Sequence, residues 1–209
     1  MRIIWTKERK EHSSRKCFEE CFKSDVYIMK VFISGGCKNG KSYYAQKLAR
    51  DMAKEKSLPL YYVATMIPQD GEDEKRIARH LKEREGWGFT TIEQGRNIEE
   101  AYRGQGVYMI DSVTALVQNE MFTRIDDGHG GVDFSFNPDA GEKVAKGLRA
   151  FAQKAENAVF VSDYIFGDAR HFDEMTESYI KGLATCDRTL ADLCHKVVEV
   201  SFSNVIEYK

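Results

Sequence analysis

Apolar and polar positions along the chain fall into two alternating patterns, one typical of buried strands and the other of packed helices. Short continuous apolar runs rich in Val, Ile and Tyr predict strands that are covered on both faces. The predicted strands cover residues 30–34, 59–65, 88–94, 106–111 and 158–163, and residues 196–209 predict a strand pair that turns at Ser203 and Asn204.

Helices are predicted between these strands, where apolar residues recur every three or four positions. The predicted helices lie directly after residue 42, within residues 66–85, and over residues 97–104, 112–122, 142–157 and 172–194. Residues 123–141 are dense in Gly, Asp and Asn, which predicts a mobile loop. Strands that alternate with helices predict an α/β fold with a largely parallel sheet, helices on both of its faces and a strand pair at the C-terminus.

The size and charge of the chain narrow the classes of protein to which it can belong. Its 209 residues suit one domain, and no apolar run approaches the roughly 20 residues of a membrane span. A formal net charge of -2 gives no overall positive field for a nucleic-acid partner. The five cysteines form no C-x-x-C pair and follow no signal peptide, which predicts a reducing, cytoplasmic environment.

The first 29 residues carry many charges of both signs and lack a periodic apolar face. We interpret them as a leader that is either a flexible or extraneous arm or a docking arm for a partner. The predicted organisation is therefore a leader over residues 1–29 and a nucleotide-binding domain over residues 30–209.

A phosphate-binding motif lies between the first predicted strand and the first predicted helix. Gly35, Gly40, Lys41 and Ser42 satisfy the spacing G-x-x-x-x-G-K-[ST] of a Walker A loop (P-loop). Glycines let successive backbone N–H groups point at phosphate oxygens, and the helix N-terminus adds partial positive charge. An ordinary glycine turn before a Lys-Ser pair is the alternative. We predict that a nucleotide contacts Gly35, Gly36, Cys37, Lys38, Asn39, Gly40, Lys41 and Ser42.

Asp111 ends a predicted buried strand, where a carboxylate can hold Mg²⁺ beside the phosphates. We predict that Ser42 and Asp111 bind the metal, with ATP or GTP as the substrate. The alternative is that Asp111 caps the helix that follows, and one residue could serve both purposes.

His80 lies on a strongly charged predicted helix, four residues after Arg76 and therefore on the same face. A neutral imidazole can attack a nucleotide α-phosphorus, although an exposed histidine is more often simply solvated. Arg76 and Lys38 are candidate partners for phosphate oxygens, and solvated surface charge is the alternative for each.

Five stretches together resemble the bifunctional adenosylcobinamide kinase / adenosylcobinamide-phosphate guanylyltransferases of cobalamin biosynthesis. The resemblance spans residues 29–209 and rests on FISGGCKNGKS, YYVAT, RIARH, MIDSVTALVQNEMF and VFVSD. It implies a P-loop NTPase-type three-layer α/β/α fold with a mostly parallel, RecA-like sheet. It also implies a homo-oligomer, with a trimer as the expected form.

The resemblance also implies two reactions. A nucleoside triphosphate phosphorylates the aminopropanol hydroxyl of adenosylcobinamide, and GMP then passes from GTP through a histidine to the new phosphate. His80 matches the histidine that accepts the guanylyl group. Lys41 stabilises the transferring phosphoryl group, and Asp163 is predicted to orient the acceptor hydroxyl.

The chain departs from the family pattern after the strand that ends at residue 163. Ser162 and Asp163 stand where the family has Asn-Glu, Ile165 replaces a glycine, and Asp187 replaces an asparagine of the last helix. These departures bear on corrinoid and base specificity. Two other functions therefore remain open: a P-loop kinase of another small hydroxyl compound, and a nucleotide-binding regulator without catalysis.

Overall fold

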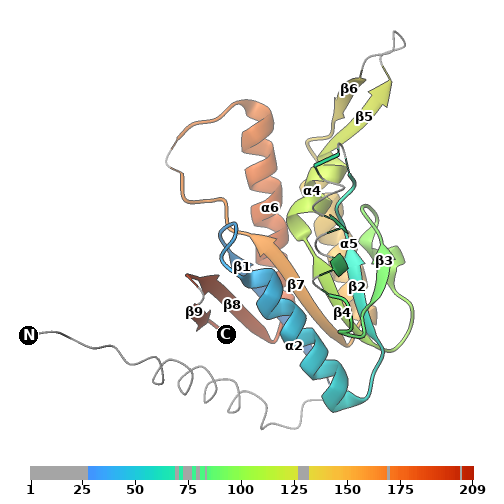
Figure 1. The fold of residues 1–209 in the computed structure, drawn as a ribbon. Coiled ribbons are helices and arrows are strands. Elements are labelled where there is room, and N and C mark those ends of the chain that lie inside the picture. The colour runs from blue at the N-terminus through green and yellow to red at the C-terminus, as the bar shows by residue number, and fades with distance from the viewer. Residues whose placement is uncertain are drawn as a thin grey trace, which may run out of the picture.

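A seven-stranded sheet covered by helices on both faces forms the body of the protein (Figure 1). The computed structural model describes residues 28–68, 71–72, 77–78, 81–82, 84–126, 132–168, 170–202 and 204–209. Among these residues, no helix is both long enough and apolar enough to cross a membrane.

The sheet follows the order β3-β2-β4-β7-β1-β8-β9, and only the β8–β9 pair is antiparallel. Its strands are β1 (Met29–Gly35), β2 (Leu60–Ala64), β3 (Thr90–Glu93), β4 (Val107–Asp111), β7 (Asn157–Asp163), β8 (Lys196–Ser201) and β9 (Asn204–Glu207). The mostly parallel sheet and the C-terminal strand pair are therefore confirmed. Because β1 lies between β7 and β8, the segment that follows β1 emerges near the middle of the sheet.

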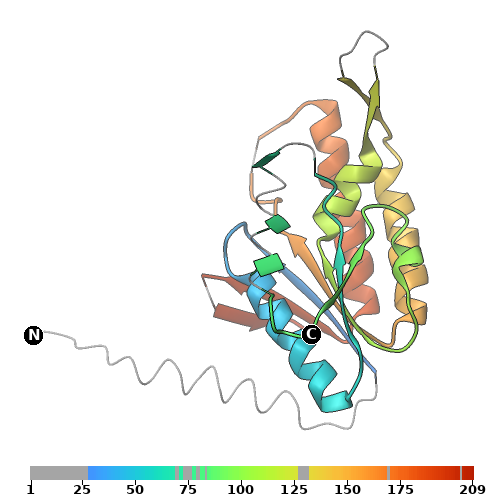
Figure 2. The ribbon, with the colours of Figure 1, turned by 45° about the vertical axis from the view of Figure 1, so that its right-hand side comes forward.

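Among the elements that the structure describes, one α-helix covers the first face of the sheet and three cover the second (Figures 1 and 2). The helix α2 (Lys41–Lys56) packs on the first face. The second face carries α4 (Val113–Met121), α5 (Ala140–Lys154) and α6 (Glu174–Leu193), with the short 3-10 helix η1 (Ile98–Ala101) against α5.

The strands supply side chains to both faces because successive residues of a strand point to opposite sides. In β1, Val31 and Ile33 pack toward α2, whereas Phe32 between them packs toward the three helices. All three are at most 4% exposed. The continuous apolar runs of the sequence are thus explained by a sheet that is buried on both faces.

Residues 123–141 differ from the loop that the sequence predicts. They include most of an antiparallel hairpin, β5 (Phe122–Asp126) and β6 (Val132–Phe136), which projects from the body beyond α4 (Figure 1). The loop prediction was wrong because the glycines Gly128, Gly130 and Gly131 fall between the two strands in sequence, whereas Phe122 and Phe136 at the base are paired and pack on the core.

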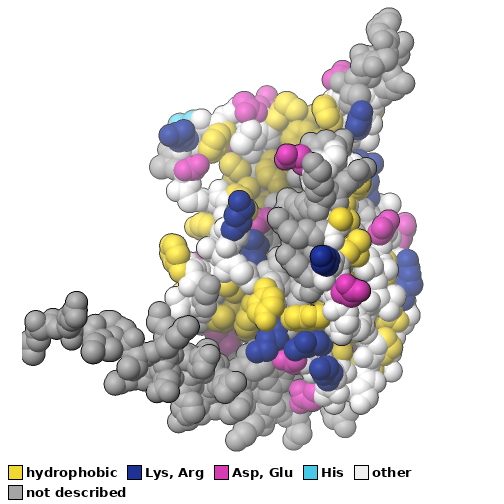
Figure 3. All heavy atoms as spheres, viewed as in Figure 1, with side chains coloured by type: hydrophobic (Ala, Val, Ile, Leu, Met, Phe, Trp, Pro, Cys, Tyr) yellow, Lys and Arg dark blue, Asp and Glu magenta, His cyan; other side chains and the backbone are white. Residues whose placement is uncertain are grey.

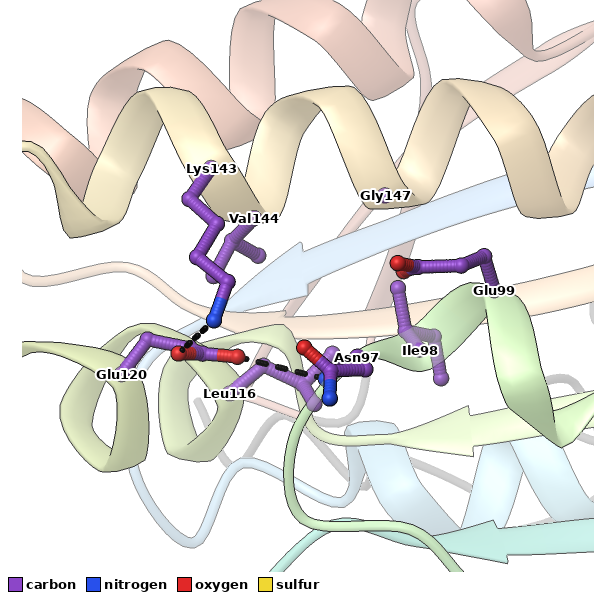
Figure 4. Close-up of a pocket in the computed structure, with 8 residues that line it drawn as sticks. All are labelled: Asn97, Ile98, Glu99, Leu116, Glu120, Lys143, Val144 and Gly147. Atoms are coloured by element: carbon purple, nitrogen blue, oxygen red, sulfur yellow. Dashed lines mark hydrogen bonds and ion pairs between the residues drawn. The ribbon is translucent and has the colours of Figure 1, made fainter.

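The helices of the second face meet through small residues and one buried charge. Gly141 of α5 lies against Gly182 of α6, so closely that a Cβ added to Gly141 would overlap the Cα of Gly182. Glu120 at the end of α4 is 7% exposed and accepts from Lys143 Nζ at 2.7 Å and from Asn97 N at 3.2 Å (Figure 4). The adjoining cavity measures only about 20 Å³, which suits a water molecule rather than a substrate.

Candidate functional site

The Walker loop leaves the sheet at the carboxyl end of β1 and turns directly into α2. Gly40 is the N-cap of α2 with a φ of 86°, a left-handed conformation that glycine adopts without a steric penalty. Lys38 is also left-handed, with a φ of 59°. These turns bring the loop back over the N-terminus of α2, where unpaired backbone N–H groups and the helix dipole favour an anion.

Gly35 fixes the base of the loop. A Cβ at this position would overlap the carbonyl oxygen of Val200 on the neighbouring β8. On the other side, the Gly35 carbonyl accepts from Tyr164 N at 2.9 Å, directly after β7. The start of the Walker loop is therefore held between two strands and has room only for glycine.

The Lys41 side chain lies along the loop and reaches an acidic partner. Its Nζ lies 2.5 Å from Asp163 Oδ1 and donates to the Gly36 carbonyl at 3.2 Å. The Lys41 side chain is 9% exposed and that of Asp163 is 30% exposed. The structure thus brings together two of the predicted catalytic residues, and the ammonium group lies where the loop would receive phosphates.

Strand register explains how Asp163 arrives there. Gly35 of β1 and Asp163 of β7 are paired residues at the carboxyl ends of adjacent parallel strands. The backbone N–H of Asp163 donates to the Thr114 hydroxyl of α4 at 2.8 Å, and the Thr114 carbonyl accepts from Tyr179 of α6 at 3.2 Å. Burial, together with the nearby carboxylates Asp163 and Asp187, raises the pKa of Tyr179 to about 12, so this phenol stays protonated as a donor.

Asp111 occupies the equivalent end of β4, one strand beyond β7. Its Oδ2 accepts from the Tyr62 hydroxyl at 2.8 Å, and the Asp111–Ser112 peptide is cis. Ser112, not Asp111, caps α4, because the Ser112 Oγ accepts from Ala115 N at 3.3 Å. The alternative interpretation of Asp111 as a helix cap is therefore wrong.

The donor set beside the loop suits Mg²⁺. The Tyr62 hydroxyl donates to Asp111 Oδ2. The other carboxylate oxygen, Oδ1, accepts no hydrogen bond from the described part of the chain. Carboxylate and hydroxyl oxygens are the protein ligands that Mg²⁺ prefers, with phosphate oxygens and water completing its shell. Ser42 and Asp111 thus have the chemistry to hold the metal of a nucleotide.

A polar pair from β7 and α6 lies next to Asp163. The Ser162 hydroxyl is fully buried and lies near Asp187 of α6, and neither Ser162 Oγ nor Asp187 Oδ1 has a well-formed hydrogen bond to a described residue. Burial raises the pKa of Asp187 to about 7, the neighbouring Ser162 hydroxyl opposes this rise, and the Asp163 charge adds to it. Ser162 and Asp187 therefore form a buried polar pair next to a predicted site residue.

Arg84 connects the segment after residue 82 to the same sheet edge. Its guanidinium lies 3.5 Å from the centroid of the Tyr62 ring, and Arg84 is 6% exposed. The Tyr62 ring thus contacts Arg84 on its face while its hydroxyl holds Asp111. A hollow of about 560 Å³ opens beside Arg84, with Lys82 and Phe89 in its wall.

The predicted site residues divide into two groups. The loop residues and Lys41, Ser42, Asp111 and Asp163 lie at adjacent strand ends and the start of α2, as described above. His80 and Arg76 lie outside the described residues. Sequence reasoning missed the positioning residues Tyr62 and Thr114, which carry no local motif and could have been found only from the pairing of β2 with β4 and the packing of α4 on β7.

Solved structures similar to this chain share 10 to 14% of its sequence. The flagellar accessory protein FlaH of Methanocaldococcus jannaschii has a TM-score of 0.45 at 14% identity, with 92% of this chain and 81% of that chain covered. The ATPase domain of G40P has a TM-score of 0.44 at 10% identity, with 90% and 82% covered. The KaiC-like protein PH0186 of Pyrococcus horikoshii OT3 has a TM-score of 0.43 at 14% identity, with 87% and 78% covered.

No curated protein matches the chain. A protein family described as cobinamide kinase / cobinamide phosphate guanyltransferase matches residues 31–203, which is most of the chain. The match includes the Walker loop, Asp111 and Asp163, whose arrangement is that of a P-loop nucleotide-binding fold. The chain therefore belongs to the cobinamide kinase / cobinamide phosphate guanyltransferase family.

Proposed function

We propose that this protein is a bifunctional transferase that phosphorylates adenosylcobinamide and then attaches GMP to the new phosphate. The observation that carries the proposal is the approach of Lys41 to Asp163 at the Walker loop, in a chain whose family match spans both predicted sites. Both reactions require a bound triphosphate, and the loop at the start of α2 is built to receive one.

In the kinase reaction, the backbone N–H groups of the Walker loop and the N-terminus of α2 hold the phosphates. Lys41 contacts the β/γ oxygens and offsets the charge that develops during transfer. When Lys41 turns to the phosphates, Asp163 Oδ1 becomes available to accept the proton of the corrinoid hydroxyl. The hydroxyl oxygen bonds to the γ-phosphorus, and the bond from that phosphorus to the nucleoside diphosphate breaks.

Ser42 and Asp111 would hold Mg²⁺, which neutralises charge on the phosphate oxygens when it is bound. The structure gives this role a physical basis in the Tyr62 hydroxyl, which holds one carboxylate oxygen of Asp111. Tyr62 thereby limits the rotation of the carboxylate and keeps the second oxygen available.

In the guanylyl reaction, a ring nitrogen of His80 attacks the α-phosphorus of GTP, and pyrophosphate leaves as the N–P bond forms. A phosphate oxygen of the phosphorylated corrinoid then attacks the same phosphorus. The N–P bond breaks, the diphosphate product forms, and His80 is regenerated. Arg76, on the same predicted face, would contact phosphate oxygens.

The decisive experiment asks whether GMP becomes covalently attached to one histidine. The protein is incubated with Mg²⁺ and GTP labelled at the α-phosphate, and intact mass and the acid and alkali stability of the label are measured. We expect one GMP per chain, bound through an acid-labile, alkali-stable bond that is absent in His80→Asn. His171→Asn, which changes an exposed histidine before α6, is the matched control.

Two results would contradict the proposal. A label that persists in His80→Asn would place the nucleotide on another residue. GTP binding without any covalent label, together with phosphorylation of a different hydroxyl compound, would favour the kinase alternative, and binding without turnover would favour the regulator.

A further inference from the structure

An exposed aromatic ring stands at the nucleoside end of the predicted triphosphate site. Tyr43 directly follows the Walker serine and lies in the first turn of α2, yet 65% of its surface is exposed. An exposed tyrosine on a helix contributes little to the packing of the core.

A second aromatic residue holds the Tyr43 ring in place. Trp87 contacts Tyr43 edge to face, with ring centroids 5.8 Å apart and an angle of 69° between the planes. Arg50, two turns further along α2, places its guanidinium 4.2 Å from the centroid of the Trp87 ring. This cation–π contact fixes Trp87 across α2, and Trp87 in turn limits the rotation of Tyr43.

Figure 3 shows that hydrophobic side chains lie next to Lys and Arg side chains over α2. Because the contact with Trp87 uses only part of the Tyr43 ring, most of the ring can receive another planar group. The cluster is therefore a preorganised aromatic surface rather than a closed core.

The direction of the triphosphate along the loop places this surface at the nucleoside. Lys41 reaches the β/γ oxygens, and its Nζ lies against Asp163, which marks the γ end of the site. The loop and the first turn of α2 contact the phosphates toward the α end. A nucleoside attached at the α-phosphate therefore leaves the loop beside the first turn of α2, which carries Tyr43.

We propose that Tyr43, supported by Trp87 and Arg50, is a stacking platform for the base of the bound nucleoside triphosphate. This assignment rests on the proposed function, because it requires a triphosphate in the Walker loop. Every nucleobase has a π-face, so a stacked tyrosine binds adenine and guanine with little discrimination. The same platform thus serves ATP and GTP, and selection between them must come from other contacts.

A second exposed aromatic pair defines the opposite end of the site. Tyr164 directly follows Asp163, is 52% exposed and contacts Phe166 edge to face at 5.5 Å. Since Asp163 marks the γ end, this pair lies on the side of the phosphoryl acceptor. Tyr43 is the exposed tyrosine at the α end of the described loop.

The test compares ligands that contain a base with one that does not. Isothermal titration calorimetry measures the Kd values of ATP, GTP and inorganic tripolyphosphate, each with Mg²⁺, for the wild type, Tyr43→Ala and Tyr43→Phe. We expect Tyr43→Ala to weaken ATP and GTP by at least about fivefold while tripolyphosphate affinity is unchanged. Tyr43→Phe retains the ring and should bind like the wild type.

Tyr208→Ala is the matched control, because Tyr208 is 66% exposed and donates to Glu199 at the far edge of the sheet. An equal loss of tripolyphosphate affinity in Tyr43→Ala, or unchanged nucleotide affinity, would overturn the platform. If the wild type bound none of the three ligands, or if Lys41→Ala bound tripolyphosphate as well as the wild type, the proposed function itself would fail. The stacking platform is therefore tested by the affinity for the base, and the proposed function by the affinity for the phosphates.

Discussion

At the scale of single residues, the site depends on which oxygen of each carboxylate is already used. Asp163 forms an ion pair with Lys41 through Oδ1, and Asp111 accepts a hydrogen bond from the Tyr62 hydroxyl through Oδ2. The first contact must change when phosphates arrive, because Lys41 then has new partners. The second contact can persist, because it leaves Asp111 Oδ1 for a cation.

We expect Tyr62→Phe to weaken the binding of Mg²⁺ to the nucleotide site. The variant keeps the ring on which Arg84 lies but removes the donor to Asp111, so the carboxylate loses its orientation. Loss of such a supporting hydrogen bond raises the Mg²⁺ midpoint by about tenfold, measured by titration of Mg²⁺ at fixed nucleotide. Tyr61→Phe, whose ring stacks on Tyr108, is the control, and an unchanged midpoint in Tyr62→Phe would refute the role of Tyr62.

Asp187 should make stability depend on pH. Its folded pKa of about 7 lies above the ordinary value of 3.8, so the folded state binds the proton more tightly than the unfolded state. The free energy of unfolding therefore falls as pH rises from about 4 to about 7, by at most about 4 kcal/mol. Asp187→Asn, which keeps the shape of the side chain but cannot take a negative charge, removes this loss.

Urea unfolding at pH 5 and pH 8 measures the effect. The advantage of Asp187→Asn over the wild type should be larger at pH 8, because Asp187 is then charged while buried. Asp192→Asn changes an exposed residue of the same helix and should show no such dependence. An advantage that did not grow with pH would mean that Asp187 titrates normally.

At the scale of elements, two helices of the second face, α5 and α6, pack through a glycine contact that has no room for a side chain. Gly141 and Gly182 let α5 and α6 approach at their backbones, and α4 packs beside both. This packing supports Thr114 of α4, whose hydroxyl accepts a hydrogen bond from the Asp163 backbone N–H. The distance between helices is therefore linked to the position of a site residue.

Gly141→Ala should destabilise the protein by about 2 kcal/mol, because the new Cβ meets the backbone of Gly182, which cannot move alone. Gly147→Ala in the same helix should cost less. Its Cβ would come closest to Glu99 Oε2, at the end of a side chain that can rotate away (Figure 4). Thermal unfolding of both variants checks this order, and equal losses would show that α5 and α6 can separate freely.

The elements of the sheet were largely predictable, because a strand buried on both faces leaves a continuous apolar run. The β5–β6 hairpin was not, because its strands are short and carry polar residues such as Thr123 and Asp133 among the apolar ones. The Walker loop was predictable because its function depends on local spacing. The contacts Tyr62–Asp111 and Ser162–Asp187 were not, because each joins residues distant in sequence through strand register and helix packing.

At the scale of the whole molecule, ligand binding to the loop should stabilise the entire fold. The loop is held between β7 and β8 and continues into α2, so its ligand is linked to both faces of the sheet. Mg²⁺ and GTP at about 100 times Kd should add about 2.7 kcal/mol and raise Tm by roughly 5 to 10 °C. Differential scanning fluorimetry measures the shift.

Lys41→Ala should lose most of this shift, because its ammonium group supplies the main side-chain charge for the phosphates. Lys143→Ala is a suitable comparison, since it also removes an ion-paired lysine but lies away from the loop, beside Glu120. If Mg²⁺ and GTP raised the Tm of Lys41→Ala as much as that of the wild type, the stabilising ligand would not be bound by the Walker loop.

The central place of β1 also constrains how the chain acquires its binding site during synthesis. Lys30 N donates to His195 Nδ1, a partner 165 residues later, and both neighbours of β1 belong to the last third of the chain. Pairings between such distant residues form late. The ribosome must therefore release almost the whole polypeptide before the newly made protein can bind a nucleotide. A chain that terminates before β8 would lack the strand that packs against Gly35.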